Sequence, residues 1–406
     1  MKLDKKLTSS VISLLPDLQQ YVTADGTLYT RLLKALYGCV QSGQLWYTKI
    51  KNILIQEKYT PTPTDPCIFR RIVNQKIYFL ILYVDDILLF ADDEEIIRVK
   101  TFMMKEFQWI TVVEGRTQSY LGMSVEVQDN AVIVDMKYYI DQLLTQLPTG
   151  LKQYDTPAIK ECFQTKPADS PLLSADARKQ FHTIVAKLLY LAKRARPDIL
   201  TITSFLCTRV KSPTKLDQRR LWRVLGYLKS TVGLKYNMVP KGPLAIVAYV
   251  DAAFATHEDS KSHSGVAVFV AGMLVYVSSR KQRCVTKSPT ESELVALTDN
   301  IGMIELFDEF ITFLVNDKIP TPVIFQDSSS VVSLVTQGGG ITRTRHLRNR
   351  MHLAKEAVDL DRLLIKHCNA KSMIADGFTK SLEGTDFKQF IHGLMIFHKQ
   401  KTTGER

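Results

Sequence analysis

Four acidic residues in the C-terminal half of the chain stand where a charge is costly without a purpose. Asp251 interrupts the apolar run "AIVAYV" of an expected strand, Asp327 closes the expected strand "VIFQ", and Asp376 lies in "MIADGF". Glu293 lies in the first turns of a helix that we expect to begin near Ser288. Converging carboxylates repel one another unless cations bind between them. Two divalent metals held in this way can activate water and stabilise the leaving oxygen in phosphodiester cleavage.

Each of these acids also has an ordinary structural explanation. Asp251 and Asp327 could be turn formers, and Asp376 could be a solvated helix residue. In "SPTESELVAL" the first Ser and the Pro begin a helix, and Glu291 completes a capping box. Glu291 therefore has a structural role already, whereas Glu293 has none, which makes Glu293 the better candidate for a metal ligand.

A second pair of acids, Asp85 and Asp86, lies between two apolar runs in "LILYVDDILLF". A tight hairpin between two such strands would present both carboxylates at its tip to metal ions and to nucleotide phosphates, with Tyr83 supporting the turn. The alternative is an ordinary hairpin turn. Asp-Asp is a poorer turn pair than Asn-Gly or Asp-Gly, which weakens that alternative.

The composition of the 406-residue chain limits the class of protein. Its hydrophobic content of 45% is enough to build two or three domains. A net charge of +12 favours a polyanionic partner such as nucleic acid, although a basic soluble protein without such a partner has the same balance. The 6 cysteines form no C-x-x-C pair, which argues against a zinc site or a disulfide framework and for a reducing compartment.

No run of about 18 apolar residues occurs, and "MKLDKKLTSS" has no signal-peptide core. We therefore expect no membrane association and an intracellular location: cytoplasmic, within a virus-like particle, or nuclear.

The elements that would position these acids change character along the chain. Strand-like runs such as "KIYFLILYV" mix with helical spacing before residue 136, which suggests an α+β arrangement. Residues 181–231 are helical in pattern, and we expect their second helix to begin with Ser212 as its cap and Pro213 at its first position. In that helix Arg219, Arg220 and Arg223 lie off the apolar stripe, where they could meet phosphates or simply face solvent.

After Pro243 the pattern is three strands followed by alternating helices and strands, which predicts a mixed sheet with helices on its faces. The expected segments are the strands "LAIVAYVDAAFA", "GVAVFVAG" and "MLVYVSSRKQ", a helix from Ser288, the strand "PVIFQD", the helix "SSVVSLVTQ", the strand "RLLIKHC" and a last helix near "SMIADGFTK".

Six ordered motifs in this half resemble the RNase H domain of copia-type LTR retrotransposons. They are "YVDAAF", "KSHSGVAVFVAG", "VSSRKQRCVTKSPTESELVAL", "VIFQDSSSVVSL", "TRTRHL" and "MIADGFTK". The resemblance implies that Asp251, Glu293, Asp327 and Asp376 are the catalytic and metal-binding set. It also implies Mg²⁺-dependent cleavage of the RNA strand of an RNA–DNA hybrid at a two-metal site, where Mn²⁺ could replace Mg²⁺.

Two further features lie near these motifs. Arg343, Arg345 and His346 of "TRTRHL" could hold the hybrid backbone, although a basic surface loop has the same sequence. By analogy with some related nucleases, His367 could shuttle a proton, but a partly buried or surface histidine is the preferred interpretation.

The resemblance extends upstream to the copia-type reverse transcriptase. "LLKALYGCVQSGQLWYTKI" resembles the segment under the incoming nucleotide and template, "LILYVDDILLF" the catalytic hairpin, and "YLGMSVEV" the strand pair that holds the primer. It implies that Asp85 and Asp86 are polymerase acids and that the template-primer is a partner. The residues implied in nucleic-acid or nucleotide binding in this half are Tyr37, Gly38, Gln41, Tyr83 and Gly122.

A third polymerase aspartate, which the family carries in a motif of the form D-x-x-x-A-[FY]-L-N, has no counterpart among Asp4, Asp17 and Asp25. We therefore expect a C-terminal fragment of a Pol polyprotein with an incomplete RNA-directed DNA polymerase, lacking the upstream protease and integrase segments.

The expected fold is an α+β partial reverse transcriptase with palm, thumb and connection, followed by an α/β RNase H-like domain with a mixed sheet. The expected domains are a partial palm at residues 1–135, a mostly helical thumb and connection at 136–243, the RNase H-like domain at 244–382 and a tail at 383–406. The alternatives are a catalytically silent relic that still binds nucleic acid and a reading frame that never yields a folded protein. The sequence does not determine the oligomeric state.

Overall fold

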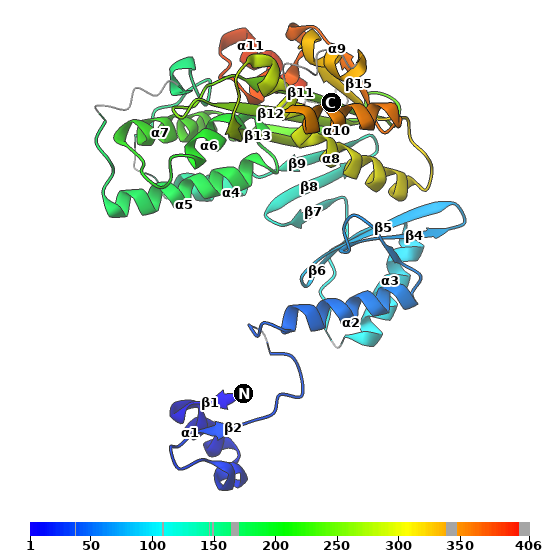
Figure 1. Cartoon of the computed structure of the whole chain (residues 1–406). Coiled ribbons are helices and arrows are strands. Elements are labelled where there is room, and N and C mark those ends of the chain that lie inside the picture. Colours follow the sequence, from blue (N-terminus) through cyan, green and yellow to red (C-terminus); the bar gives the residue numbers. More distant parts are fainter. Residues whose placement is uncertain are drawn as a thin grey trace, which may run out of the picture. The chain divides into compact units, whose positions relative to one another are not determined.

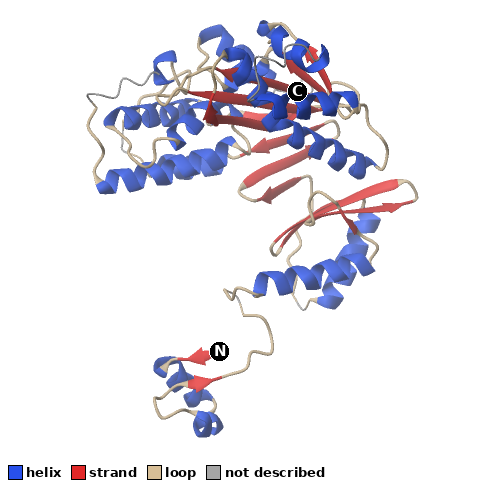
Figure 2. Cartoon of the chain, in the orientation of Figure 1, coloured by secondary structure: helices blue, strands red, loops and turns tan. Residues whose placement is uncertain are grey.

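The computed structural model describes residues 1–36, 38–107, 109–145, 147, 150–163, 170–337 and 347–397. The chain divides into two compact units, residues 1–108 and 109–406, which are described separately (Figure 1). Both units contain helices and strands, as Figure 2 shows. Within the described residues, no helix has the length and apolar character that a membrane span requires.

The first unit is built around a four-stranded antiparallel sheet of order β3-β4-β5-β6. Alternate residues of β5, namely Tyr78, Leu80 and Leu82, are buried, as expected for a strand with one face on a core. The elements of this unit are β1 (Lys2–Leu3), α1 (Lys5–Leu14), η1 (Pro16–Tyr21), β2 (Leu28–Tyr29), α2 (Ser42–Gln56), β3 (Thr60–Pro61), β4 (Ile68–Val73), β5 (Lys76–Tyr83), β6 (Asp86–Phe90) and α3 (Asp93–Glu106).

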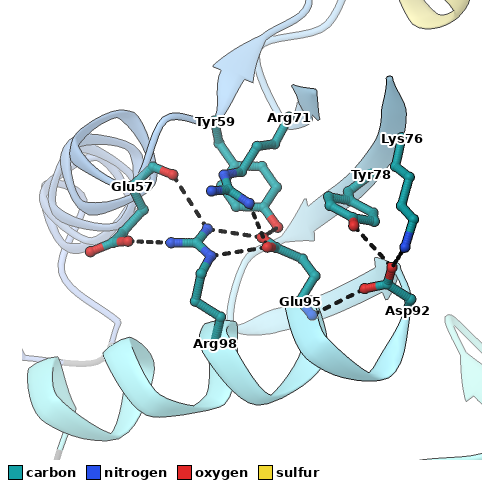
Figure 3. A network of polar contacts seen from close by, with 8 residues as sticks. All are labelled: Glu57, Tyr59, Arg71, Lys76, Tyr78, Asp92, Glu95 and Arg98. Atoms are coloured by element: carbon teal, nitrogen blue, oxygen red, sulfur yellow. Dashed lines mark hydrogen bonds and ion pairs between the residues drawn. The ribbon is translucent and has the colours of Figure 1, made fainter. Parts of the chain in front are cut away.

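Helix α3 is fixed to this sheet through the buried carboxylate of Glu95, which is 3% exposed (Figure 3). Glu95 accepts hydrogen bonds from the Tyr59 hydroxyl at 2.7 Å and from the guanidinium groups of Arg71 and Arg98. Burial alone would raise the pKa of Glu95, but the hydrogen bonds from Arg98 and Tyr59 outweigh it and lower the pKa. Arg98 also pairs with Glu57 just after α2, so one network connects both helices to the sheet.

The start of α3 is held by a second carboxylate, Asp92 (Figure 3). Its side chain accepts from the backbone N–H of Glu95 at 3.2 Å and so caps the helix. On the β5 side it accepts from Lys76 Nζ at 2.7 Å and from the Tyr78 hydroxyl at 3.0 Å. The cap therefore also connects the helix to the neighbouring strand.

The second unit begins with an antiparallel sheet of order β16-β10-β9-β8-β7. The last described strand, β16, pairs with β10, so the chain returns to this sheet after the strands and helices between them. The strands are β7 (Thr117–Tyr120), β8 (Met123–Gln128), β9 (Ala131–Asp135), β10 (Lys235–Met238) and β16 (Ile396–Phe397).

Between β9 and β10 the chain is mainly helical, as predicted. Ser174 caps α5, which begins at Ala175. The elements are α4 (Lys137–Thr145), η2 (Lys160–Phe163), α5 (Ala175–Ala192), η3 (Pro197–Ile199), α6 (Leu200–Cys207) and α7 (Lys215–Ser230).

Helix α7 begins two residues later than the sequence predicted. The cap is Thr214, whose hydroxyl accepts from the Asp217 N–H at 3.2 Å while the Asp217 carboxylate accepts from the Thr214 N–H at 2.9 Å. This reciprocal pair satisfies two backbone donors, and the predicted Ser212 and Pro213 precede it. The capping box also buries the Asp217 carboxylate beneath the first turn of the helix.

The expectation that Arg220 is available to phosphates is wrong. Its side chain is 5% exposed and pairs with Asp217 at 2.9 Å. Arg223 is half-buried and donates to the Thr156 hydroxyl at 2.9 Å, so Arg219 is the exposed arginine of the three.

The predicted mixed sheet is confirmed, with the order β13-β12-β11-β14-β15. β11, β12 and β13 are antiparallel, and β11, β14 and β15 are parallel. The elements are β11 (Ile246–Ala253), β12 (Lys261–Val270), β13 (Met273–Val285), α8 (Pro289–Val315), β14 (Val323–Gln326), α9 (Ser329–Gln337), α10 (Arg348–Asp359), β15 (Leu364–His367), η5 (Ala370–Ser372), η6 (Ile374–Phe378) and α11 (Gly384–Gly393). Helix α10 was not predicted, and the expected helix at "MIADGF" is the short 3₁₀ turn η6.

Each face of this sheet has its own hydrophobic core. Residues on one face, such as Phe269 and Val277, pack in a cluster with residues of α5, α6 and α7. Ala248 and Val250 on the other face pack in a cluster with α8, α9 and α10. The side chains of a strand alternate between the two faces of a sheet. The helices before residue 243 therefore cover one face of the sheet that follows them, and α8, α9 and α10 cover the other.

Candidate active site

Asp251 lies in the middle of the mixed sheet, on β11, and is 2% exposed. The hydroxyl of Thr379, just after η6, donates a hydrogen bond to Asp251 Oδ2. A buried carboxylate needs such partners, because its desolvation is otherwise uncompensated. The turn-former alternative for Asp251 is therefore wrong.

Two further predicted acids converge on Asp251. Glu293, in the second turn of α8, and Asp327, directly after β14, each place a carboxylate oxygen so that the three ligand atoms lie within 4.8 Å of one another. The parallel pairing of β11 with β14 places Asp327 at the carboxyl end of the neighbouring strand. Gln326, which was not among the predicted site residues, donates to Glu293 Oε2 at 3.1 Å and accepts from the Asp327 N–H at 3.1 Å.

The fourth predicted acid, Asp376 on η6, is not part of this compact group. It is linked to the group by Lys380, which was also not among the predicted site residues. Lys380 Nζ lies 2.8 Å from Asp376 Oδ1 and 3.8 Å from Asp251 Oδ2. Three of the four acids therefore lie together, and a lysine ammonium bridges the fourth to Asp251.

The start of α8 explains why Glu293 is available. Ser288 caps the helix, with Oγ accepting from the Glu291 N–H at 3.2 Å, and Pro289 occupies the first turn, as predicted. Glu291 has a structural role at this end of the helix, because its carboxylate accepts from the Lys287 N–H at 2.8 Å; the predicted capping box with Ser288 stays a prediction. Glu293, two residues on, faces the other acids.

The electrostatics of the group follow from burial and crowding. Burial and the neighbouring carboxylates raise the pKa of Asp251 to about 6 and that of Glu293 to about 9, and they raise the pKa of Asp327 as well. Burial alone would lower the pKa of Lys380, but the adjacent carboxylates raise it, so the ammonium stays charged. Burial, and to a smaller extent the nearby carboxylates, also raise the pKa of the Cys368 thiol to about 11.

Gly265 allows η6 to approach the sheet. It pairs with Asp251 across β11 and β12. A Cβ at this position would lie 2.8 Å from the Ala375 carbonyl oxygen, 2.8 Å from Thr379 Cγ2 and 2.9 Å from Phe378 Cβ. A side chain here would therefore push η6, with Asp376, away from Asp251.

The remaining candidates of this half are more peripheral. His367 is exposed, as the preferred interpretation expected, and its Nε2 lies 3.1 Å from the Asp327 carbonyl oxygen. Arg343, Arg345 and His346 lie outside the described residues.

In the first unit the predicted hairpin between β5 and β6 is confirmed. Its two-residue turn consists of Val84 and Asp85, while Asp86 begins β6 and pairs with Tyr83. Both acids are exposed, and Val84 has a left-handed φ of 55°. Trp46 of α2 donates its indole N–H to the Val84 carbonyl, so the helix holds the turn. Within the described ranges, no third acid joins this pair in a group that could hold a metal.

The other candidates of the reverse transcriptase segment lie at turns. Gly38 has a φ of 91°, and Gln41 immediately precedes α2. Gly122, with a φ of 74°, forms the turn between β7 and β8, where Tyr190 donates to the Leu121 carbonyl at 2.6 Å. Tyr37 lies outside the described residues. The binding roles of Gly38, Gln41, Tyr83 and Gly122 stay predictions.

The donor set of the C-terminal site fits a hard divalent cation. All three converging ligand atoms are carboxylate oxygens, which such cations prefer. Burial and the neighbouring carboxylates raise the pKa values of Asp251 and Glu293, so ionising both acids is costly unless a cation lies beside them.

Comparisons with known proteins cover most of the chain. Residues 20–160 match the family model of reverse transcriptase (RNA-dependent DNA polymerase). The chain is 27% identical over 368 residues to the Pol polyprotein of transposon TNT 1-94 from Nicotiana tabacum, covering 88% of this chain and 27% of that protein. It is 25% identical over 367 residues to the Pol polyprotein of transposon RE1 from Arabidopsis thaliana, covering 89% and 24%. The chain thus spans about a quarter of the length of these relatives.

Solved structures resemble parts of the chain. An RNase H1 in complex with an RNA/DNA hybrid is 16% identical, covers 32% of this chain and 88% of its own, and has a TM-score of 0.25. A foamy virus protease-reverse transcriptase is 14% identical, covers 87% of this chain and 41% of its own, and has a TM-score of 0.26. The chain is thus similar over most of its length to the Pol polyproteins of copia-type retrotransposons, and its residues 20–160 match the reverse transcriptase family model.

Proposed function

We propose that the second unit cleaves the RNA strand of RNA–DNA hybrids with the help of Mg²⁺, and that Asp251, Glu293, Asp327 and Asp376 hold the metal. The observation that carries the proposal is the convergence of three carboxylate oxygens within 4.8 Å from β11, α8 and the end of β14. Mg²⁺ bound there, or Mn²⁺ in its place, would activate a water molecule and stabilise the leaving oxygen of a phosphodiester.

The protein's own contribution is orientation of the carboxylates before any metal binds. The Thr379 hydroxyl fixes the rotamer of Asp251, and the Gln326 amide fixes Glu293 while its carbonyl oxygen holds the Asp327 backbone. Ligands held in this way lose little conformational freedom when a cation arrives. Burial of Asp251 and Glu293 excludes bulk water, which strengthens their attraction for a cation.

The test uses the full chain and a labelled RNA–DNA hybrid with Mg²⁺. We expect cleavage that EDTA abolishes and that Asp251→Asn reduces by at least about 100-fold, since the group lies at the centre of the site. Asp155→Asn, at an exposed position of the same unit, is the matched control and should cleave like the wild type. Hybrid binding without cleavage would instead favour the silent nucleic-acid-binding protein.

For DNA synthesis we propose that residues 1–406 alone are nearly inactive. The support is the exposed pair Asp85 and Asp86, which no third carboxylate joins among the described residues. Polymerase chemistry at a two-metal site needs enough ligands to hold both ions. Primer extension with this chain should therefore give negligible product, and efficient Mg²⁺-dependent extension would contradict the proposal.

A further inference from the structure

Lys380 places a flexible cation inside the carboxylate group. Its Nζ lies 2.8 Å from Asp376 Oδ1 and 3.8 Å from Asp251 Oδ2, and its side chain is 49% exposed. The side chain of Asp251 is 2% exposed and that of Asp376 is 27% exposed. The ammonium therefore enters from the solvent side and contacts one buried and one half-buried acid.

The position of Lys380 also explains why Asp376 stands apart from the other three acids. The three carboxylate oxygens that lie within 4.8 Å of one another belong to Asp251, Glu293 and Asp327. Oδ1 of Asp376 accepts a hydrogen bond from the ammonium of Lys380, four residues later in the chain. An ammonium and a divalent cation are both attracted to the same oxygens, and two cations at such short range repel each other.

We propose that Lys380 is an exchangeable internal counter-cation: it neutralises Asp251 and Asp376 while the site holds no metal, and it leaves them when a divalent cation binds. The inference rests on the proposed metal site and adds a residue that regulates its occupancy. Lysine suits this role, because its ammonium is a point charge on a flexible four-carbon stem and can move into solvent without disturbing the backbone.

Two measurable consequences follow from this exchange. The metal must displace Lys380, so removing the ammonium should tighten metal binding, by a factor of about 10 within the range of about 5 to 150 typical of coupled sites. The metal-free protein should lose stability in the same variant, because the acids lose their counter-charge. A lysine with a purely structural role would show the second effect without the first.

The first experiment measures Mg²⁺ affinity by calorimetry without nucleic acid. Lys380→Met keeps the length of the side chain and removes its charge, and Lys380→Arg keeps the charge. Lys388→Met, at an exposed position of α11, is the matched control. We expect about tenfold tighter binding for Lys380→Met, with Lys380→Arg and Lys388→Met close to the wild type. Equal or weaker affinity in Lys380→Met would overturn the inference.

The second experiment needs no substitution, so it does not depend on how a variant folds. Reductive methylation followed by mass spectrometry reports the reactivity of each lysine amine in the wild-type chain. Reactivity of Lys380 should rise severalfold on addition of Mg²⁺, while that of Lys388 should not change. No rise at Lys380 despite measured Mg²⁺ binding would overturn the inference alone. Failure of the wild type to bind Mg²⁺ at all would overturn the proposed function itself.

Discussion

Replacing Asp251 with asparagine should stabilise the metal-free protein while it removes the proposed activity. The pKa of this carboxyl rises from 3.8 to about 6 on folding, chiefly because of burial. At pH 7 the group is ionised in both states, and each step of one in pKa corresponds to about 1.4 kcal/mol, so keeping the charge costs about 3 kcal/mol of stability. The amide in the Asp251→Asn variant carries no charge, and its oxygen can still accept the hydrogen bond from the Thr379 hydroxyl.

The pH dependence gives this prediction a specific signature. A carboxyl whose pKa is raised by folding releases its proton more readily in the unfolded state, so stability is lost as pH rises from about 4 to about 6. The advantage of Asp251→Asn should therefore be about 3 kcal/mol at pH 7 and fall to less than about 1 kcal/mol at pH 4.

The assay is urea unfolding in EDTA at several pH values, with Asp155→Asn as the exposed control. A second set with Mg²⁺ should stabilise the wild type and leave Asp251→Asn unchanged, since bound ligand stabilises the folded state only. The reasoning would be refuted if Asp251→Asn were no more stable than the wild type at pH 7, or if its advantage did not depend on pH.

Three further predictions concern other parts of the chain. His263 is buried, and burial lowers its pKa to about 3, so the unfolded state takes up a proton at a higher pH than the folded state does. The contribution of His263 to stability is therefore complete above pH 6.5, and about 2 kcal/mol of it should be lost by pH 5. The midpoint of urea unfolding should fall accordingly with pH, and His263→Gln should flatten that dependence. Gly265→Ala should lower stability by about 1–3 kcal/mol and weaken Mg²⁺ binding, because the new methyl group meets the Ala375 carbonyl. Thermal unfolding measures the stability and calorimetry the Mg²⁺ affinity. An unchanged melting temperature would contradict this prediction. Glu95→Gln should cost about 3–5 kcal/mol in chemical unfolding of the first unit, because it leaves Arg98 without its buried partner, and a loss below about 1 kcal/mol would count against the network.

Local patterns in the sequence were sufficient for elements whose determinants are close together in the chain. The Ser288 cap, the period-two burial of β5 and the hairpin before Asp86 each depend on residues within a few positions of one another. The start of α7 was misplaced for a related reason. Both Ser212 and Thr214 are acceptable caps, and the choice of Thr214 depends on the buried partner Asp217.

Long-range packing decided what the patterns left open. The sequence predicted the helices before residue 243 to be a separate segment, yet they share a core with one face of the sheet that follows. The mixed sheet could be inferred from element order, but the return of β16 to β10 joins strands too far apart in sequence for any local signal.

For the candidate site, the sequence by itself determined which acids are out of place: Asp251 in an apolar strand, Asp327 at a strand end and Glu293 beyond the capping residue. Only the tertiary structure decided that three of them meet within 4.8 Å, that Gln326 orients two of them and that Lys380 holds Asp376. Whether a residue type is favourable in its own helix or strand depends on neighbours close by in the chain, so a sequence pattern can predict it. A distance between side chains from different elements depends on how the whole core packs.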